Sequence, residues 1–183
     1  MSGHNKWSQI KHKKAASDGE RSRLFSKHSK MITMEARNAA GNLAAPGLAA
    51  AVERAKHDSM PKDNIERAVA KGSGSDAVAL QSVLFEAFGP GGVAMLITAV
   101  TDNNNRTSQE IKHIFSKLGF VLGTPSSAAW AFTKTATGYV PASPINLDGA
   151  SGESLAGLVE ALEEQPDVQD IYTTADEIMA DAL

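Results

Sequence analysis

The hydrophobic period and the sign of the charge both change at one short segment, Gly72-Ser73-Gly74-Ser75. Before it, apolar residues recur at the spacing of amphipathic helices, and after it they form strand-like runs. Residues 1–72 hold 14 Lys and Arg against 7 Asp and Glu, whereas residues 73–183 hold 4 against 14. Because Gly/Ser-rich segments are typical of flexible linkers, the sequence predicts a basic arm and helical domain over 1–72, a linker over 73–80 and an acidic α+β domain over 81–183.

Composition excludes several classes of protein. The 183 residues include no cysteine, which rules out disulfides, thiolate metal sites and cysteine nucleophiles. No apolar run approaches the roughly 20 residues that span a bilayer, and Met1–Trp7 lacks the apolar stretch of a secretory signal. We therefore expect a cytoplasmic protein that does not bind a membrane.

Three helices are predicted in the basic half. The first covers residues 22–40, and at about 100° per residue its inner face carries Phe25, Ile32, Ala36 and Ala39. The second covers residues 47–57. The third begins at Pro61 and ends at Gly72, since proline suits a first helical position and glycine a helix end.

The acidic half shows mixed elements. Strands are predicted at 83–88, 93–101, 127–133, near 139 and at 168–173, and helices from a Thr107–Glu110 capping box, at 153–164 and at 175–183. Gly89–Gly92 is interpreted as a hairpin turn rather than a phosphate loop, because it lacks the Gly-Lys-Ser/Thr signature. The order predicts an α+β fold: an all-helical N-terminal domain followed by a helix-backed mixed or antiparallel sheet.

The N-terminal arm is the strongest candidate for binding. It offers cationic groups for phosphates and flat side chains for bases or sugars. These residues are His4, Lys6, Trp7, Lys11, His12, Lys13 and Lys14. A disordered solubilising tail is the alternative interpretation, although such a tail gains nothing from a tryptophan.

A basic stripe continues from the arm along the first predicted helix. Arg23, Lys27, Lys30 and Arg37 fall opposite the apolar face, within an arc of roughly 80°. The stripe is either an ordinary solvated helix face or an extension of the arm. Together, arm and stripe would contact several phosphates, and binding would weaken steeply with salt.

No catalytic constellation is evident. Asp102 and the asparagines after it fit a turn and helix start better than a calcium loop, with Arg106 left exposed as a possible further contact. His113 lies three residues after Glu110 without a nucleophile or second ligand nearby. We expect no enzymatic activity, no cofactor, no metal and no small-molecule substrate.

Four blocks of sequence resemble the YebC family, which includes the mitochondrial translational activators of cytochrome oxidase. They are Gly3–Trp7 with Ile10–Ala16, Met60–Ala68, Gly89–Ala94 and Thr101–Thr107, and the resemblance covers nearly the whole chain. It implies a helical domain followed by two α+β domains, one inserted in the other. Only a short connector, about residues 135–152, stands where the inserted domain would be.

The resemblance implies one of two functions. Members of the family are described as probable DNA-binding transcriptional regulators, and others resemble ribosome-associated factors that relieve stalling at proline-rich stretches. In the second case the arm would reach ribosomal RNA and tRNA. Phosphate contacts do not distinguish RNA from DNA, but a stacking tryptophan without an obvious recognition helix favours RNA. Our leading hypothesis is a ribosome-associated translation factor, and the alternative is a DNA-binding regulator.

Overall fold

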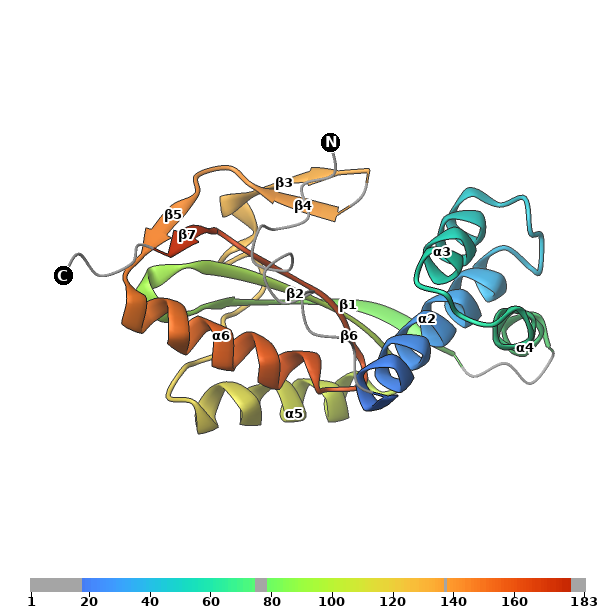
Figure 1. The fold of residues 1–183 in the computed structure, drawn as a ribbon, viewed down its shortest axis with the longest axis horizontal. Coiled ribbons are helices and arrows are strands. Elements are labelled where there is room, and N and C mark those ends of the chain that lie inside the picture. Colours follow the sequence, from blue (N-terminus) through green and yellow to red (C-terminus); the bar gives the residue numbers. More distant parts are fainter. Residues whose placement is uncertain (1–17, 75–78, 137, 179–183) are drawn as a thin grey trace. The chain divides into compact units, whose positions relative to one another are not determined.

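The computed structural model describes residues 18–74, 79–136 and 138–178. The chain divides into two compact units. Among the described residues, one unit holds 18–83 and 100–104, and the other holds 84–99 and 105–178. By their secondary structure we call residues 18–74 the helical unit and residues 79–178 the sheet unit (Figure 1). The predicted α+β class, helices first and a helix-backed sheet second, is confirmed. The assignment of 73–80 as a linker between domains stays a prediction.

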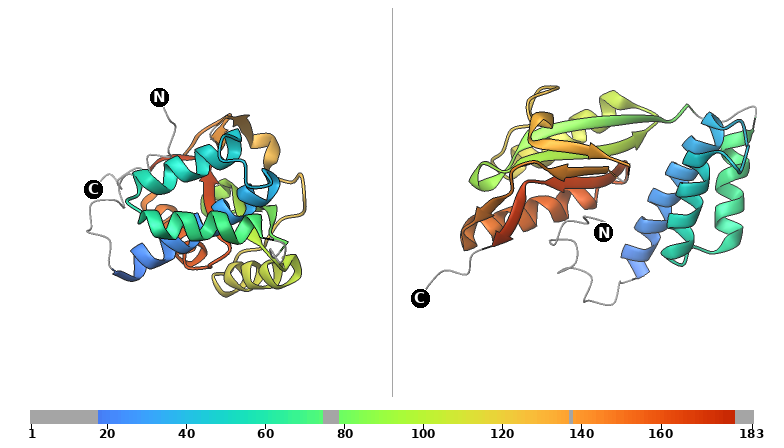
Figure 2. Two further views of the ribbon diagram at one scale, coloured as in Figure 1. Left: turned by 90° about the vertical axis from the view of Figure 1, so that its right-hand side faces the viewer. Right: turned by 90° about the horizontal axis from the view of Figure 1, so that it is seen from above.

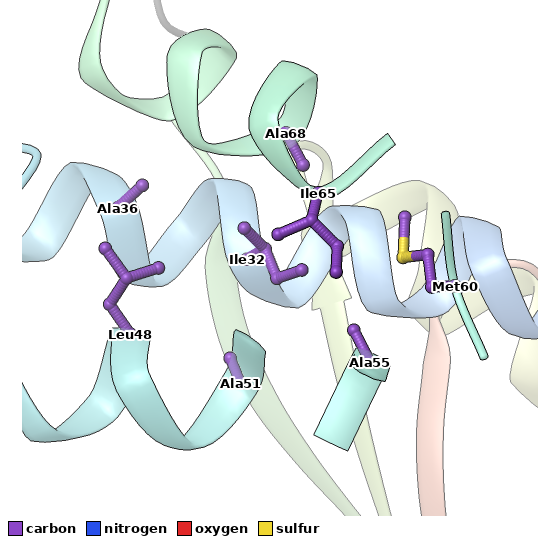
Figure 3. Close-up of a cluster of buried hydrophobic side chains, with 8 residues drawn as sticks. All are labelled: Ile32, Ala36, Leu48, Ala51, Ala55, Met60, Ile65 and Ala68. Atoms are coloured by element: carbon purple, nitrogen blue, oxygen red, sulfur yellow. The ribbon is translucent and has the colours of Figure 1, made fainter. Parts of the chain in front are cut away.

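The helical unit consists of α2 (Asp18–Asn38), α3 (Pro46–His57) and α4 (Lys62–Ser73). Figure 2 shows the three helices alongside one another in its right-hand view. Their shared core is drawn in Figure 3 and consists of Ile32, Ala36, Leu48, Ala51, Ala55, Met60, Ile65 and Ala68. The three predicted helices and the predicted inner positions Ile32 and Ala36 are confirmed.

The prediction that α4 ends at Gly72 is wrong, because the helix continues to Ser73. Gly72 is buried at the crossing of α4 and α2. A Cβ there would overlap the carbonyl oxygen of Thr33 and lie 2.8 Å from the Cβ of Ala36. Beside it, the Thr33 hydroxyl donates a buried hydrogen bond of 3.2 Å to the Ala68 carbonyl. The glycine therefore allows two backbones to approach closely.

The sheet unit is built on a three-stranded sheet. Its order is β1 (Gln81–Phe88), β2 (Ala94–Thr101), β6 (Val168–Thr173), and β2 runs antiparallel to β6. Figure 1 shows α5 (Asn104–Lys117) and α6 (Gly149–Glu163) on one side of this sheet and the hairpin β3–β4 (Phe132–Thr135, Gly138–Pro141) on the other. Because both faces are covered, almost every side chain of the central strand β2 is buried.

Several predicted elements in the sheet unit are wrong. Ala175 begins a strand, β7 (Ala175–Ile178), instead of a terminal helix, because it pairs in parallel with β5 (Ile145–Leu147), which the sequence did not indicate. Residues 179–183 lie outside the described residues. The segment predicted as a strand from Ser127 contains a 3₁₀ turn, Ala129–Ala131, and the strand starts at Phe132.

The predicted capping box at Thr107 is also wrong. Helix α5 begins at Asn104, and Thr107 is fully buried inside its first turns. Its hydroxyl donates a hydrogen bond of 2.6 Å to the buried carboxylate of Asp167, next to β6. Thr107 therefore joins helix to strand, and local sequence cannot reveal a partner so distant along the chain.

A buried carboxylate on β1 organises the segment that leads to β3. Glu86 is only 7% exposed, and its two oxygens accept hydrogen bonds of 2.7 Å from three backbone N–H groups, those of Ser126, Ala128 and Ala129. Burial by itself raises the pKa of the Glu86 carboxyl, but these three hydrogen bonds lower it below its usual value. The ionised side chain therefore fixes this segment against the sheet.

Candidate nucleic-acid interface

Helix α2 carries the predicted basic stripe. Arg23 and Arg37 are exposed, whereas Lys27 and Lys30 are half-buried. The opposite side of the helix enters the core through Ile32 and Ala36, which are fully buried. Burial is not confined to that side, because Met34 falls within the arc of the stripe and is only 8% exposed. The stripe is therefore exposed at Arg23 and Arg37 rather than along its whole length.

More than half of the net positive charge of residues 1–74 lies in residues 1–17, which the structure does not describe. Residues 18–74 hold ten Lys and Arg against seven Asp and Glu, whereas residues 1–17 hold four lysines and no acid. The predicted arm contacts, namely His4, Lys6, Trp7, Lys11, His12, Lys13 and Lys14, lie outside the described residues. Their role, like that of the stripe, stays a prediction.

A histidine–aspartate pair connects α2 to the turn between α3 and α4. The Nε2 atom of His28 lies 2.7 Å from Oδ2 of Asp58, and the Nδ1 atom of His57 lies 3.1 Å from Oδ1. Burial raises the pKa of the Asp58 carboxyl, but the hydrogen bonds and charges of the two histidines lower it overall. Asp58 thus ties α2 to the turn between α3 and α4.

Substitution of Asp58 by Asn should destabilise the helical unit by about 1 kcal/mol, since its side chain is 34% exposed and solvent weakens the interaction. The folded pKa lies below the usual 3.8, so the stabilisation is present above pH 3.8 and is lost as the pH falls through the folded pKa. Urea unfolding followed by circular dichroism at pH 7 and at pH 3 measures both effects. A deficit that persists unchanged at pH 3 would contradict this account.

Arg106 is engaged inside the sheet unit. Its Nη2 atom lies 3.0 Å from Oδ2 of Asp167, and the Arg106 side chain keeps 45% of its surface exposed. Asp167 is further held by Thr107, and the Gln165 side chain accepts from its backbone N–H at 2.6 Å. This network stabilises the junction of α5 and β6, and a contact of Arg106 with a partner stays a prediction.

Helix α4 does not present a strongly basic first turn. In α4, Lys62 lies 3.4 Å from the carboxylate of Glu66, and Arg67 donates to the Asn64 side chain and to the backbone oxygen of Asp63. The exposed charges at the start of α4 therefore compensate one another. The first turns of a DNA-recognition helix normally contact base edges and phosphates, and this charge balance is unsuited to that role.

Within the described ranges, no three His, Cys, Asp or Glu side chains lie together in a way that could hold a metal ion, and no helix is long and apolar enough to cross a bilayer. Sequence reasoning missed three organising groups, Glu86, His28 and Asp167. Glu86 alone left a signal, a carboxylate in the middle of an otherwise apolar strand.

Comparison with known families identifies two matching regions. The model of the TACO1/YebC protein N-terminal domain matches residues 5–75, and the model of the TACO1/YebC second and third domain matches residues 80–138. Between β3 and α6 the described residues form only the short strands β4 and β5.

Curated relatives and a solved structure agree with these matches. A "probable transcriptional regulatory protein" of Petrotoga mobilis is 41% identical over 181 residues, which cover 97% of this chain and 72% of the relative. A relative of the same name from Desulfatibacillum aliphaticivorans is 44% identical over 179 residues, which cover 97% of this chain and 72% of the relative. The crystal structure of a conserved hypothetical protein from Aquifex aeolicus superposes with a TM-score of 0.84 at 26% identity, covering 98% of this chain and 100% of that one. The chain belongs to the TACO1/YebC family.

Proposed function

We propose that this protein is a non-enzymatic regulator of gene expression that binds nucleic acid through its basic arm and the basic stripe of α2. It acts in the cytoplasm, on the ribosome, where it contacts ribosomal RNA or tRNA and relieves stalling, for example at proline-rich stretches. No cofactor takes part. The observation that carries the proposal is the charge division, 14 basic against 7 acidic residues before residue 73 and 4 against 14 after it.

The position of the stripe supports the proposal. A partner that approaches α2 from the side of the stripe meets Arg23 and Arg37, which are exposed, although Met34 within the same arc is buried. The acidic sheet unit repels polyanions, so that nucleic acid is directed to the N-terminal region. Binding then depends on positioning and on release of counterions from phosphates.

A DNA-binding transcriptional regulator is the second candidate. The printed names of the curated relatives favour it. The internally compensated charges at the start of α4 favour RNA instead, because the first turns of this helix offer no basic face to a DNA groove. Retention on promoter DNA with discrimination between base pairs would favour this second candidate.

The arm is tested by a Lys11→Ala/Lys13→Ala/Lys14→Ala variant of the full chain. We expect affinity for purified ribosomes to fall about tenfold or more. The log–log dependence of affinity on salt should become shallower by about two units, at roughly 0.7 for each phosphate that the variant no longer neutralises. Sedimentation at several salt concentrations measures both quantities.

A charge-matched control is Lys112→Ala/Lys117→Ala/Lys134→Ala, which removes three exposed lysines from the sheet unit. This control should bind ribosomes as tightly as the parent protein, or slightly less tightly because of its altered net charge. Equal losses in the two variants, or binding that does not respond to salt, would refute a phosphate-binding arm.

A further inference from the structure

Trp130 is a large apolar side chain that the fold leaves in solvent. It lies in the 3₁₀ turn Ala129–Ala131 and is 73% exposed, whereas Ala131 and Phe132 beside it are buried in a small core with Leu96 of β2. Single exposed apolar residues are ordinary, so exposure by itself does not identify a site. The way in which the indole is fixed gives a second observation.

Two sets of hydrogen bonds hold Trp130 in place. Its indole N–H donates a hydrogen bond of 2.8 Å to the carbonyl of Ser127. The buried carboxylate of Glu86 accepts hydrogen bonds of 2.7 Å from the N–H groups of Ala128 and Ala129, and so fixes the backbone immediately before the indole. A ring that is already ordered loses little conformational entropy when a ligand stacks on it.

The satisfied N–H defines which chemistry the indole still offers. Its single polar group is used inside the protein, so the ring presents an apolar aromatic face. Such a face stacks on any nucleobase and raises affinity about fivefold or more for each base. One tryptophan side chain buries about 150–250 Å². This area suffices for a base but is a fraction of the roughly 800 Å² that each partner contributes to a stable protein interface.

The charges nearest to Trp130 along the chain are positive. Residues 104–134 hold all four basic residues of the acidic half and one acid, whereas residues 135–183 hold ten acids and no basic residue. Residues 118–133 are uncharged, and exposed lysines, Lys117 and Lys134, border them. Lys134 follows Trp130 by four residues, which span at most about 14 Å. The segment of Trp130 therefore does not share the acidic excess that repels polyanions.

We propose that Trp130 is a second contact with nucleic acid, on which an unpaired base stacks. The arm and the stripe bind phosphates, which are the same in paired and unpaired strands, whereas Trp130 selects strands whose bases are free to stack. This inference rests on the proposed function, because it adds a contact with the same nucleic acid. An apolar pocket of a protein and a second copy of this chain are the other occupants that the test distinguishes.

The fluorescence of Trp130 in the full chain identifies the occupant. Trp7→Phe leaves Trp130 as the only tryptophan, because the chain contains two. The probes are single-stranded polyuridylate, a fully paired RNA duplex, ribosomal protein freed of RNA, and rising concentrations of the variant itself. We expect saturating polyuridylate to quench the emission about twofold or more, and the duplex, whose bases already stack on one another, to leave it unchanged. Equal quenching by the duplex, a response to protein or concentration alone, or no response would overturn the proposal.

The salt dependence of affinity separates stacking from phosphate binding. Trp130→Ala should weaken binding of polyuridylate about fivefold or more at every salt concentration without changing the log–log slope, because a stacked base releases no counterion. Trp130→Phe, which keeps a ring, should lose less. Val121→Ala, which truncates another exposed apolar side chain of the same segment, is the control and should bind like the parent protein.

Equal losses in Trp130→Ala and Val121→Ala, or a changed slope in Trp130→Ala, would contradict stacking. The Lys11→Ala/Lys13→Ala/Lys14→Ala variant should lower the slope instead. If that variant binds RNA like the parent protein, the proposed function of the arm fails, and the comparison of Trp130→Ala with Val121→Ala still decides the role of Trp130.

Discussion

Glu86→Ala is expected to destabilise the sheet unit by about 3 kcal/mol or more. The substitution removes the acceptor of three hydrogen bonds of 2.7 Å, and a bond to a charged group contributes roughly 1.5–3 kcal/mol. Part of the loss is recovered because solvent reaches the N–H of Ser126, which is exposed. Glu86→Gln keeps one acceptor oxygen and places an amide donor against backbone donors, so we expect about half the loss.

Urea unfolding followed by the backbone amide NMR signals of β1 and β2 measures this effect in the sheet unit. Glu153→Ala, which removes an exposed carboxylate from α6, is the matched control and should change stability by less than about 0.5 kcal/mol. Equal behaviour of the two variants would contradict the role of Glu86.

The effect of Glu86 should also depend on pH in a defined direction. The pKa of the folded carboxyl lies below its usual 4.5, so the unfolded chain binds the proton more readily. The contribution of Glu86 is therefore complete above pH 4.5 and is lost as the pH falls through the folded pKa. The difference between the parent protein and Glu86→Ala should shrink in unfolding experiments performed below that pH.

Gly72→Ala is expected to destabilise the helical unit by about 2 kcal/mol, although alanine is the better helix former by about 1 kcal/mol. The new Cβ overlaps the backbone oxygen of Thr33, which cannot move away without separating α2 from α4. Separation would also lengthen the buried hydrogen bond from Thr33 to Ala68. The backbone amide NMR signals of α2 and α4 during urea unfolding, compared with those of β1 and β2, measure the loss.

Gly74→Ala provides the control two residues later. A Cβ there would lie 3.6 Å from the nearest atom, the Ala70 oxygen, an ordinary contact, and the backbone φ of −73° suits alanine. Reduced freedom of the unfolded chain should make this variant neutral or more stable by about 0.5 kcal/mol. A Gly72→Ala protein as stable as Gly74→Ala would show that the helix crossing does not need a glycine.

The elements with strong local patterns could be predicted from sequence. The three helices of the basic half, the strands around Gly89–Gly92 and the helix through Leu155 and Leu162 agree with the structure, because each depends on a hydrophobic period that neighbouring residues alone define. The strand at Ala175 could not be predicted, since its pairing with Ile145 joins segments far apart along the chain. Short apolar segments of this kind take the conformation that a partner strand imposes.

The candidate site, too, could be predicted from the sequence only in part. The positions of Arg23, Lys27, Lys30 and Arg37 on one side of a helix follow from spacing, because a helix has a fixed number of residues per turn. The roles of Arg106 and Thr107 do not follow from spacing, because their partner Asp167 is distant in sequence.

By itself, the sequence determined the helices of the basic half, the first two strands of the sheet and the division of charge, since period and composition are local properties. Only the tertiary structure decided what the single residues do. Gly72 allows two helices to meet, Glu86 holds a distant loop and Trp130 stays outside the core. The physical reason is that close packing and satisfaction of buried polar groups depend on neighbours that folding brings together.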